Sequence, residues 1–237
     1  MSVAKSVAAH GKTLLMEAAL ALVVRTRSLQ ALGIREIGRE AGLNPNTFYR
    51  HFKNMDELGL AIIENVVNEL REPLRKLRLE ALDTLLEKGQ IESGPSIAGF
   101  DLQQIHQVVR VTVRLFLEFA AKRPNAFMLG VRELHGASPV LRKALREAMA
   151  NFVDDMAEDL KTRNVLPTLD DARLHQLCKV TIREMFILSM DYIEHKDQRE
   201  QIALEAESMI VTLVTGAATL SSLQHNEAGK VLRAGEI

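Results

Sequence analysis

The sequence predicts an all-α protein with an N-terminal three-helix helix-turn-helix domain and a larger helical domain after it. Two observations carry that prediction. Apolar residues recur three and four positions apart along most of the chain, which is the spacing of one helix face. A short turn of glycine, asparagine and proline, at residues 42–45, separates two such stretches near the N-terminus. No stretch alternates as a strand would, and we place the domains at 1–54 and 55–237.

The turn at residues 42–45 predicts the second and third helices of a helix-turn-helix. Gly42 suits the end of a helix, where a residue free to take a positive φ is favoured. Asn44 can cap the next helix, and Pro45 suits its first turn. Upstream, residues 34–41 form the supporting helix.

Phe48 and Phe52 are four residues apart, so they share one helix face and should point into a core. The other side chains should face outward, with short polar groups first and hydroxyl, guanidinium and imidazole donors behind, as in a helix placed in the DNA major groove. Asn46 can read adenine, whereas Tyr49 and His51 should donate to phosphates. The predicted DNA-binding residues are Arg35, Asn44, Pro45, Asn46, Thr47, Tyr49, Arg50, His51 and Lys53.

The charge is distributed unevenly along the chain, although the net charge is only −1. Residues 1–54 contain eight lysines and arginines against three acids, and the remainder contains 22 against 28. A basic N-terminal end favours attraction to nucleic-acid phosphates there. The partner that we expect is double-stranded, palindromic operator DNA.

Composition and cysteine content indicate the cellular compartment of the protein. The 237 residues are 47% hydrophobic, enough for a substantial core, and a single cysteine excludes a disulfide framework within this chain. The chain begins without a secretory signal pattern, and the apolar run 209–223 is short and rich in threonine and serine. We therefore expect a cytoplasmic protein with no membrane partner.

Helical periodicity extends through the rest of the chain, after a loose arm at 1–10. Asn54 and Glu57 have the spacing of a capping box and open a long helix that Pro73 should kink or break. Glycine, serine and proline indicate a surface loop over 88–99. The helices expected elsewhere lie at about 12–27, 102–122, 139–163, 170–195 and 198–222, with a short one after Arg123-Pro124-Asn125.

The last two helices are apolar on more than one face, which predicts a homodimer closed by a four-helix bundle. The alternative is that the extra face covers the central helix at 102–122. A two-fold dimer also suits a palindromic operator. The predicted dimer-interface residues are Leu177, Ile182, Met209, Leu213 and Ala217.

Methionine and phenylalanine side chains on the central helices could line a deformable apolar pocket for a long flexible ligand, although each could equally be ordinary core. An arginine at the wall or mouth of that pocket could meet an anionic group. The predicted ligand-binding residues are Phe116, Phe119, Phe127, Met128, Arg132, Phe152, Met156, Met185 and Phe186.

Two motifs give the chain a family resemblance. The run Thr47-Phe48-Tyr49-Arg50-His51-Phe52, followed by Asp56-Glu57-Leu58, resembles the recognition-helix signature of the TetR family of bacterial repressors. Glu118-Phe119, residues 123–127 and Arg132-Glu133 resemble the FabR/DesT-type regulators of unsaturated fatty acid synthesis within that family. The resemblance covers most of residues 12–165. It implies a repressor that responds to long-chain acyl-CoA or acyl-carrier-protein thioesters and needs no cofactor or metal.

Other functions remain as alternatives. An enzyme is disfavoured because the chain has no glycine-rich phosphate loop, no His-Glu-x-x-His and no nucleophile motif. His175 and Cys178 could share a metal with another histidine, but two ligands are weak evidence. The acids at 154–159 indicate a solvated helix face, not paired catalytic carboxylates. A helical interaction module without DNA affinity is a further alternative.

A drug-efflux repressor that senses aromatic cations is the alternative within the same family. Such pockets favour buried acids among tryptophan and tyrosine. This chain has no tryptophan and only two tyrosines, which favours a lipid-derived, anionic effector.

Overall fold

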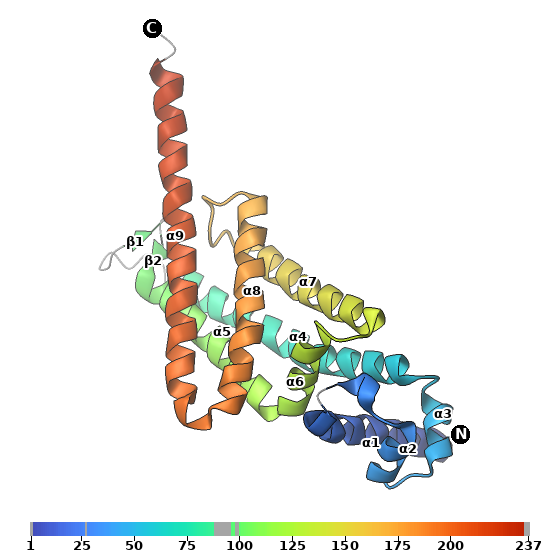
Figure 1. Ribbon diagram of the computed structural model, residues 1–237. Helices are drawn as coiled ribbons and strands as arrows, with labels where there is room; N and C mark the ends of the chain where they lie inside the picture. The colour runs from blue at the N-terminus through green and yellow to red at the C-terminus, as the bar shows by residue number, and fades with distance from the viewer. Residues whose placement is uncertain (1, 27, 88–95, 98–99, 235–237) are drawn as a thin grey trace. The chain divides into compact units, whose positions relative to one another are not determined.

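The computed structural model describes residues 2–26, 28–87, 96–97 and 100–234, which are almost entirely helical (Figure 1). The α-helices are α1 Ser2–Thr26, α2 Ile34–Glu40, α3 Phe48–His51, α4 Met55–Glu87, α5 Leu102–Lys122, α6 Pro124–Glu133, α7 Pro139–Thr162, α8 Asp171–Glu194 and α9 Arg199–Ala234. Short 3-10 helices are η1 Leu29–Ala31, η2 Pro45–Thr47 and η3 Lys196–Gln198. The all-α class with an N-terminal helix-turn-helix is confirmed.

Three sequence predictions about these elements were wrong. Strand β1 (Ser96–Ile97) pairs antiparallel with β2 (Phe100–Asp101), inside and just after the segment predicted as a loop. Helix α1 begins at Ser2, where a loose arm was expected. Helix α4 continues through the exposed Pro73, so the predicted break there is absent, and Leu70 and Leu74 on either side are buried. Residues 88–95 and 98–99 of the predicted loop lie outside the described residues.

The chain forms two compact units whose boundaries do not coincide with residue 54. Unit 1 consists of residues 1–70 and 122–148, and unit 2 consists of residues 71–121 and 149–237. Helices α4 and α7 therefore each contribute one part to unit 1 and another to unit 2. The division into DNA-binding and ligand-binding parts at residue 54 stays a prediction about function.

Unit 1 has a continuous apolar core that includes residues from α6 and α7. Its buried side chains include Leu22, Ile37, Phe48, Leu129 and Leu141. A Cβ added to Gly59 on α4 would fall within 3 Å of the Leu141 side chain, so α4 and α7 pack closely there. This packing explains why residues 122–148 belong to the helix-turn-helix unit.

A buried carboxylate also joins α6 to the first part of unit 1. Glu133 is 1% exposed, and its Oε1 accepts a hydrogen bond from the Leu29 backbone N–H at 3.0 Å. The Ser28 hydroxyl donates to the same oxygen at 3.3 Å. The carboxylate thus caps the first residue of η1 and fixes the position of the connection between α1 and α2.

In unit 2, α8 and α9 lie side by side (Figure 1). Val113, Phe116 and Leu117 of α5 are buried, as are Ile182 of α8 and Ile210 of α9. The segment Lys196–Leu223 is long and apolar enough to cross a bilayer by length and composition, and a third of its most apolar window is buried. Core helices of soluble proteins meet the same criterion, so this is weak evidence for a membrane.

Candidate DNA-binding surface and ligand cavity

The turn between α2 and the recognition segment has the predicted capping geometry. Gly42 adopts a φ of +66°, in the left-handed region that favours glycine. The Leu43 N–H donates to the Gly38 carbonyl at 2.9 Å, which closes the end of α2. The Asn44 side chain accepts a hydrogen bond from the Asn46 N–H at 2.9 Å, so its cap role is confirmed.

The recognition segment differs from the predicted single helix in its first turn. Residues 45–47 form the 3-10 helix η2, and α3 follows from Phe48 to His51. Phe48 and Phe52 are 0% and 2% exposed with ring centroids 5.6 Å apart, as the four-residue spacing predicted. The two rings anchor the segment, so its polar side chains are held at the surface of unit 1.

The predicted DNA-contacting side chains differ in their exposure to solvent. Arg35, Asn44, Asn46, Tyr49, Arg50 and Lys53 are exposed, whereas Pro45, Thr47 and His51 are half-buried. Tyr49 is 64% exposed, although its ring packs edge-on against Phe48 at 5.7 Å. A tyrosine held so far out of the core has its hydroxyl available to a phosphate.

Two glycines that sequence reasoning did not single out shape this surface. A Cβ on Gly38 would lie 3.0 Å from Pro45 Cα and 3.4 Å from the Leu43 carbonyl oxygen, so α2 touches the recognition segment there. A Cβ on Gly11 would lie 2.9 Å from His51 Nε2, so the imidazole packs against α1. The expectation that His51 faces fully outward is therefore corrected.

A second capping arrangement begins α4. The Glu57 N–H donates to the Asn54 side chain at 2.9 Å, as the capping-box spacing predicted. The Glu57 carboxylate accepts from the Lys53 N–H at 2.5 Å, one residue before the cap. The chain that leaves the recognition segment is thereby fixed to the first turn of α4.

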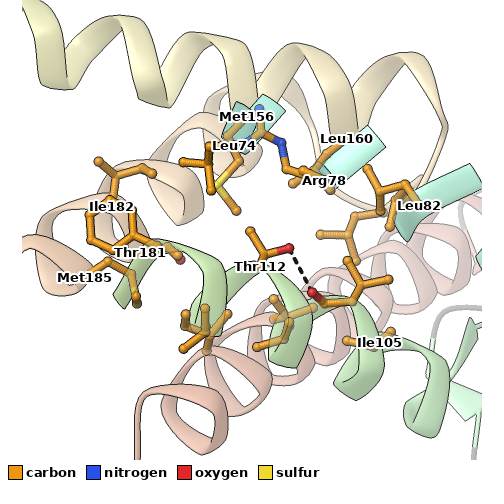
Figure 2. Close-up of a pocket in the computed structure, with 18 residues that line it drawn as sticks. Leu74, Arg78, Leu82, Ile105, Thr112, Met156, Leu160, Thr181, Ile182 and Met185 are labelled. Carbon is orange, nitrogen blue, oxygen red and sulfur yellow. Dashed lines mark hydrogen bonds between the residues drawn. The ribbon is translucent and has the colours of Figure 1, made fainter. Parts of the chain in front are cut away.

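Unit 2 contains an apolar cavity of about 100 Å³ (Figure 2). Its walls come from α4, α5, α7, α8 and α9, together with the segment that follows α7. They include Leu74, Leu82, Ile105, Met156, Leu160, Ile182 and Met185. In size and lining the cavity suits a small apolar molecule or one part of a larger one.

The cavity includes only some of the predicted ligand-binding residues. Phe116, Met156 and Met185 line it. Phe186 lies outside the lining and contacts Phe116 and Phe152, with ring centroids 5.4 and 6.4 Å away, and Phe119 is half-buried elsewhere on α5. Phe127, Met128 and Arg132 belong to unit 1 and are not part of the lining.

The predicted place of Arg132 at the cavity wall is thereby corrected. Its Nη1 donates to the Val23 carbonyl at 3.4 Å inside unit 1. The one charged residue in the described lining is Arg78 of α4. Its spacing from Leu74 and Leu82, four residues on either side, was the sequence signal that could have found it.

Arg78 belongs to a ladder of ion pairs between α4 and α7 in unit 2. Its Nε and Nη2 both donate to Oδ2 of Asp159, the first at 3.0 Å, and both side chains are almost fully buried. Arg75 donates to the other oxygen of Asp159 at 3.0 Å. Arg71 holds Asp155 with two hydrogen bonds, of 2.5 and 2.8 Å.

These contacts correct the expectation of a solvated acidic face at 154–159. Asp155 and Asp159 are 6% and 2% exposed because the helix turns them toward the arginines of α4. The hydrogen bonds from Arg71 hold the pKa of Asp155 below its usual range, since they stabilise its ionised form. The acids are thus part of the internal structure of unit 2, while Asp154 is exposed.

Residues predicted for the dimer interface lie on α8 and α9 with differing exposure. Leu177 and Ile182 are buried within unit 2, and Ile182 lines the cavity. Met209, Leu213 and Ala217 are half-buried. The well-exposed apolar side chains of these helices are instead Val180, Ile187, Leu204, Leu220 and Leu223.

The histidine and cysteine suggested as a metal pair have other surroundings. His175 Nε2 lies 3.1 Å from Asp154 Oδ1 at the surface. Cys178 is fully buried, and this burial raises the pKa of its thiol to about 12. Within the described parts of the chain, no three His, Cys, Asp or Glu side chains are grouped to hold a metal ion.

Comparison with known proteins finds a family match in the N-terminal part of the chain. Residues 15–62 match the family of bacterial regulatory proteins named the tetR family. That span contains the second half of α1, all of α2 and α3, and the start of α4. The helix-turn-helix described above therefore lies within the matched span.

Solved structures share the fold over most of the chain. The fatty acid degradation regulator FadR from Bacillus halodurans has a TM-score of 0.61 at 13% identity, covering 87% of this chain and 95% of that one. Thermus thermophilus FadR with lauroyl-CoA has a TM-score of 0.54 at 22% identity, covering 86% and 93%. Bacillus subtilis FadR with stearoyl-CoA has a TM-score of 0.55 at 17% identity, covering 86% and 98%.

At these identities the solved structures establish the fold alone, and the sequence match is confined to residues 15–62. The segment that matches is also the one whose caps, turn and buried phenylalanines form a helix-turn-helix. The helix-turn-helix of this protein is therefore similar to that of the tetR family of bacterial regulatory proteins.

Proposed function

We propose that the protein is a ligand-responsive repressor of fatty acid metabolism genes that senses long-chain acyl thioesters. The observation that carries this proposal is the cavity of unit 2, whose lining is aliphatic apart from Arg78, two threonines, two methionines and one phenylalanine. A hydrocarbon chain suits such walls because each buried methylene contributes about 0.8 kcal/mol. Two of the proteins with the same fold were solved with lauroyl-CoA and stearoyl-CoA.

The size of the cavity determines how such an effector acts. A cavity of about 100 Å³ is smaller than the ~300–1,000 Å³ of most ligand pockets, so a long acyl chain requires the surrounding helices to separate. The cavity walls include α4, which also continues into unit 1. Entry of the chain therefore favours a different packing around α4, and operator affinity changes with it.

The acyl carrier remains outside this cavity. Arg78 is already bonded to Asp159, so the cavity offers no uncompensated cation to an anionic carrier. The carrier's phosphates would stay in water while the apolar chain is buried, which is the arrangement of lowest desolvation cost. In this proposal the protein is a cytoplasmic regulator, not an enzyme, and needs no cofactor or metal.

A homodimer is the functional form that we propose for binding a palindromic operator. Its interface is formed by the exposed apolar side chains of α8 and α9, which a monomer would leave in water. The half-buried Met209, Leu213 and Ala217 border this face. Two-fold symmetry would present two recognition segments to two half-sites.

Titration of a labelled operator complex with stearoyl-CoA and oleoyl-CoA tests the effector. Both should change operator affinity, in different measure because straight and kinked chains fill different shapes, while a cationic dye has little effect. Val109→Phe, which fills the cavity, should abolish the response, and Val111→Phe on the exposed side of α5 should preserve it. A strong response to the dye beside none to either thioester would instead establish the drug-efflux alternative.

A binding assay in which genomic fragments replace the labelled operator tests the FabR/DesT-type assignment. We expect the fragments retained to lie beside genes of unsaturated fatty acid synthesis. Fragments beside fatty acid degradation genes alone would contradict that finer assignment while leaving the acyl-thioester proposal intact.

A further inference from the structure

Thr181 of α8 places a hydroxyl at the cavity wall that has no hydrogen-bond partner among the described residues. The side chain is 4% exposed, so water does not solvate it freely. Figure 2 shows Thr181 beside Ile182 and Met185, with α4 and Thr112 across the cavity. A buried hydroxyl without a partner is destabilising. Its presence in a largely apolar wall is accounted for if a ligand in the cavity supplies the missing hydrogen-bond partner.

Other threonines of this chain make a local hydrogen bond that the Thr181 hydroxyl does not make. Thr84, Thr112, Thr212 and Thr219 each donate to the carbonyl four residues earlier at 2.8 Å. This is the usual local solution for a threonine inside a helix. Thr168 and Thr215 also have unpartnered hydroxyls, but neither lines the cavity. Thr181 combines an unpartnered hydroxyl with a place in the lining.

The remaining polar groups of the cavity are already engaged. The Thr112 hydroxyl donates to the Val108 carbonyl, as the dashed line in Figure 2 shows. Arg78 donates to Asp159 through Nε and Nη2. A carboxylate inside the cavity would meet a guanidinium that is already neutralised, and its desolvation would go uncompensated. One uncharged polar atom is what the cavity can accommodate.

We propose that Thr181 is the specificity-determining contact of this cavity, which takes an uncharged, largely apolar group bearing one hydrogen-bonding oxygen. This inference rests on the proposed function only in treating the cavity as the effector site. The oxygen can belong to the thioester carbonyl of an acyl carrier or to an oxygen on the chain itself. In either case the Thr181 hydroxyl selects the oxygen-bearing ligand over its hydrocarbon counterpart.

Phenol and toluene provide a matched pair of probes because they differ only in a hydroxyl against a methyl group. A cavity of similar size binds a single benzene ring. Dissociation constants of both probes are measured by calorimetry for the full chain, Thr181→Val and Thr112→Val. We expect Thr181→Val to raise the ratio of the phenol constant to the toluene constant on the order of tenfold. Thr112→Val should leave that ratio within about twofold, because its hydroxyl already bonds Val108.

The opposite results would overturn the proposal. An unchanged ratio in Thr181→Val, an equal change in Thr112→Val, or no saturable binding of phenol would each do so. If Thr181→Val unfolds, the pair Thr181→Ser and Thr181→Ala reports on the hydroxyl, and only the alanine should raise the ratio.

A titration with stearoyl-CoA then distinguishes a failure of the Thr181 contact from a failure of the acyl-thioester effector. A weaker response to stearoyl-CoA in Thr181→Val than in Thr112→Val identifies the thioester carbonyl as the oxygen. If the phenol ratio changes as expected and stearoyl-CoA has no effect on any variant, the Thr181 contact stands. The acyl-thioester effector alone would then be wrong.

Discussion

Gly38 and Gly42 shape the helix-turn-helix for different physical reasons. Gly42 is required by its backbone, because a φ of +66° is costly for residues with a Cβ. Gly38 has ordinary helical geometry and is required by space, because Pro45 lies against it. A pattern of residue types indicates the need for a positive φ at Gly42, but it does not indicate the close packing at Gly38.

Gly38→Val is expected to displace the recognition segment and weaken operator binding. Its Cβ alone would lie 3.0 Å from Pro45 Cα, and overpacking of this kind costs about 1–3 kcal/mol. Gly33→Val is the control, since a Cβ there meets nothing nearer than 3.9 Å. Fluorescence anisotropy with a labelled operator measures both, and equal affinities of the two variants would contradict the packing argument.

Tyr49→Phe should weaken binding to operator and non-operator DNA alike, because the exposed hydroxyl is expected to donate to a phosphate and not to a base. Asn46→Ala is the contrast: loss of a bidentate contact to adenine should cost about 1–3 kcal/mol of discrimination at one position. Binding to a panel of single-base operator variants distinguishes the two. A shifted base preference in Tyr49→Phe would refute this division of roles.

At the scale of elements, the ion-pair ladder between α4 and α7 determines how unit 2 holds together. The pair of Arg78 and Asp159 is nearly excluded from water, so its stability depends on both partners being present. The ladder also runs beside the cavity, since Arg78 lines it. Disturbance of the cavity and disturbance of the ladder should therefore affect each other.

Asp159→Asn should lower the free energy of unfolding of unit 2 by about 3–5 kcal/mol, because it leaves a buried guanidinium without its counter-charge. Asp154→Asn, one turn earlier on the exposed side of the same helix, should change it by less than about 0.5 kcal/mol. Urea titrations followed by circular dichroism measure both. Similar midpoints for the two variants would show that the ladder contributes little.

Asp155 is expected to contribute to loss of stability at low pH. Its pKa is lowered in the folded chain, mainly by the hydrogen bonds from Arg71, so its contribution is complete above the ordinary aspartate pKa of 3.8. The contribution is lost as the pH falls through the lower, folded-state pKa. Urea midpoints of Asp155→Asn should be lower than those of the unmutated chain at pH 7, with a difference that shrinks below about pH 4. A difference that stays constant with pH would argue against this linkage.

At the scale of the whole molecule, we expect the exposed apolar side chains of α8 and α9 to decide the oligomeric state. Leu220 and Leu223, three residues apart on one side of α9, are 64% and 57% exposed, and exposed apolar patches mark interaction sites. The helix continues to Ala234, well past the predicted end at residue 222. A second copy of the chain is the partner that the proposed operator symmetry requires.

Charges placed on this face should produce monomers that bind the operator weakly. Ile187→Glu and Leu220→Glu are the informative variants, and Val140→Glu in unit 1 is a control of similar exposure to Ile187. Light scattering reports the mass, and the control should remain dimeric. A monomeric unmutated chain would remove the basis for the proposed interface.

The sequence by itself determined the features that depend on near neighbours along the chain. Helix positions, the Gly42 turn, the Asn44 and Asn54 caps and the burial of Phe48 with Phe52 all involve residues within about four positions of one another. Such contacts leave a periodic signal in residue types. The family resemblance drew on the same local signals, and residues 15–62 match the family model.

Only the tertiary structure decided which distant residues meet. Arg78 and Asp159 are 81 positions apart, and Glu133 and Leu29 are 104 apart, so no local pattern pairs them. The unpartnered state of Thr181 likewise depends on where its hydroxyl lies within the cavity, because the same residue type at 112 bonds its own helix. Burial and pairing are properties of the packed chain, since they arise from contacts between elements and not from the order of residues within one.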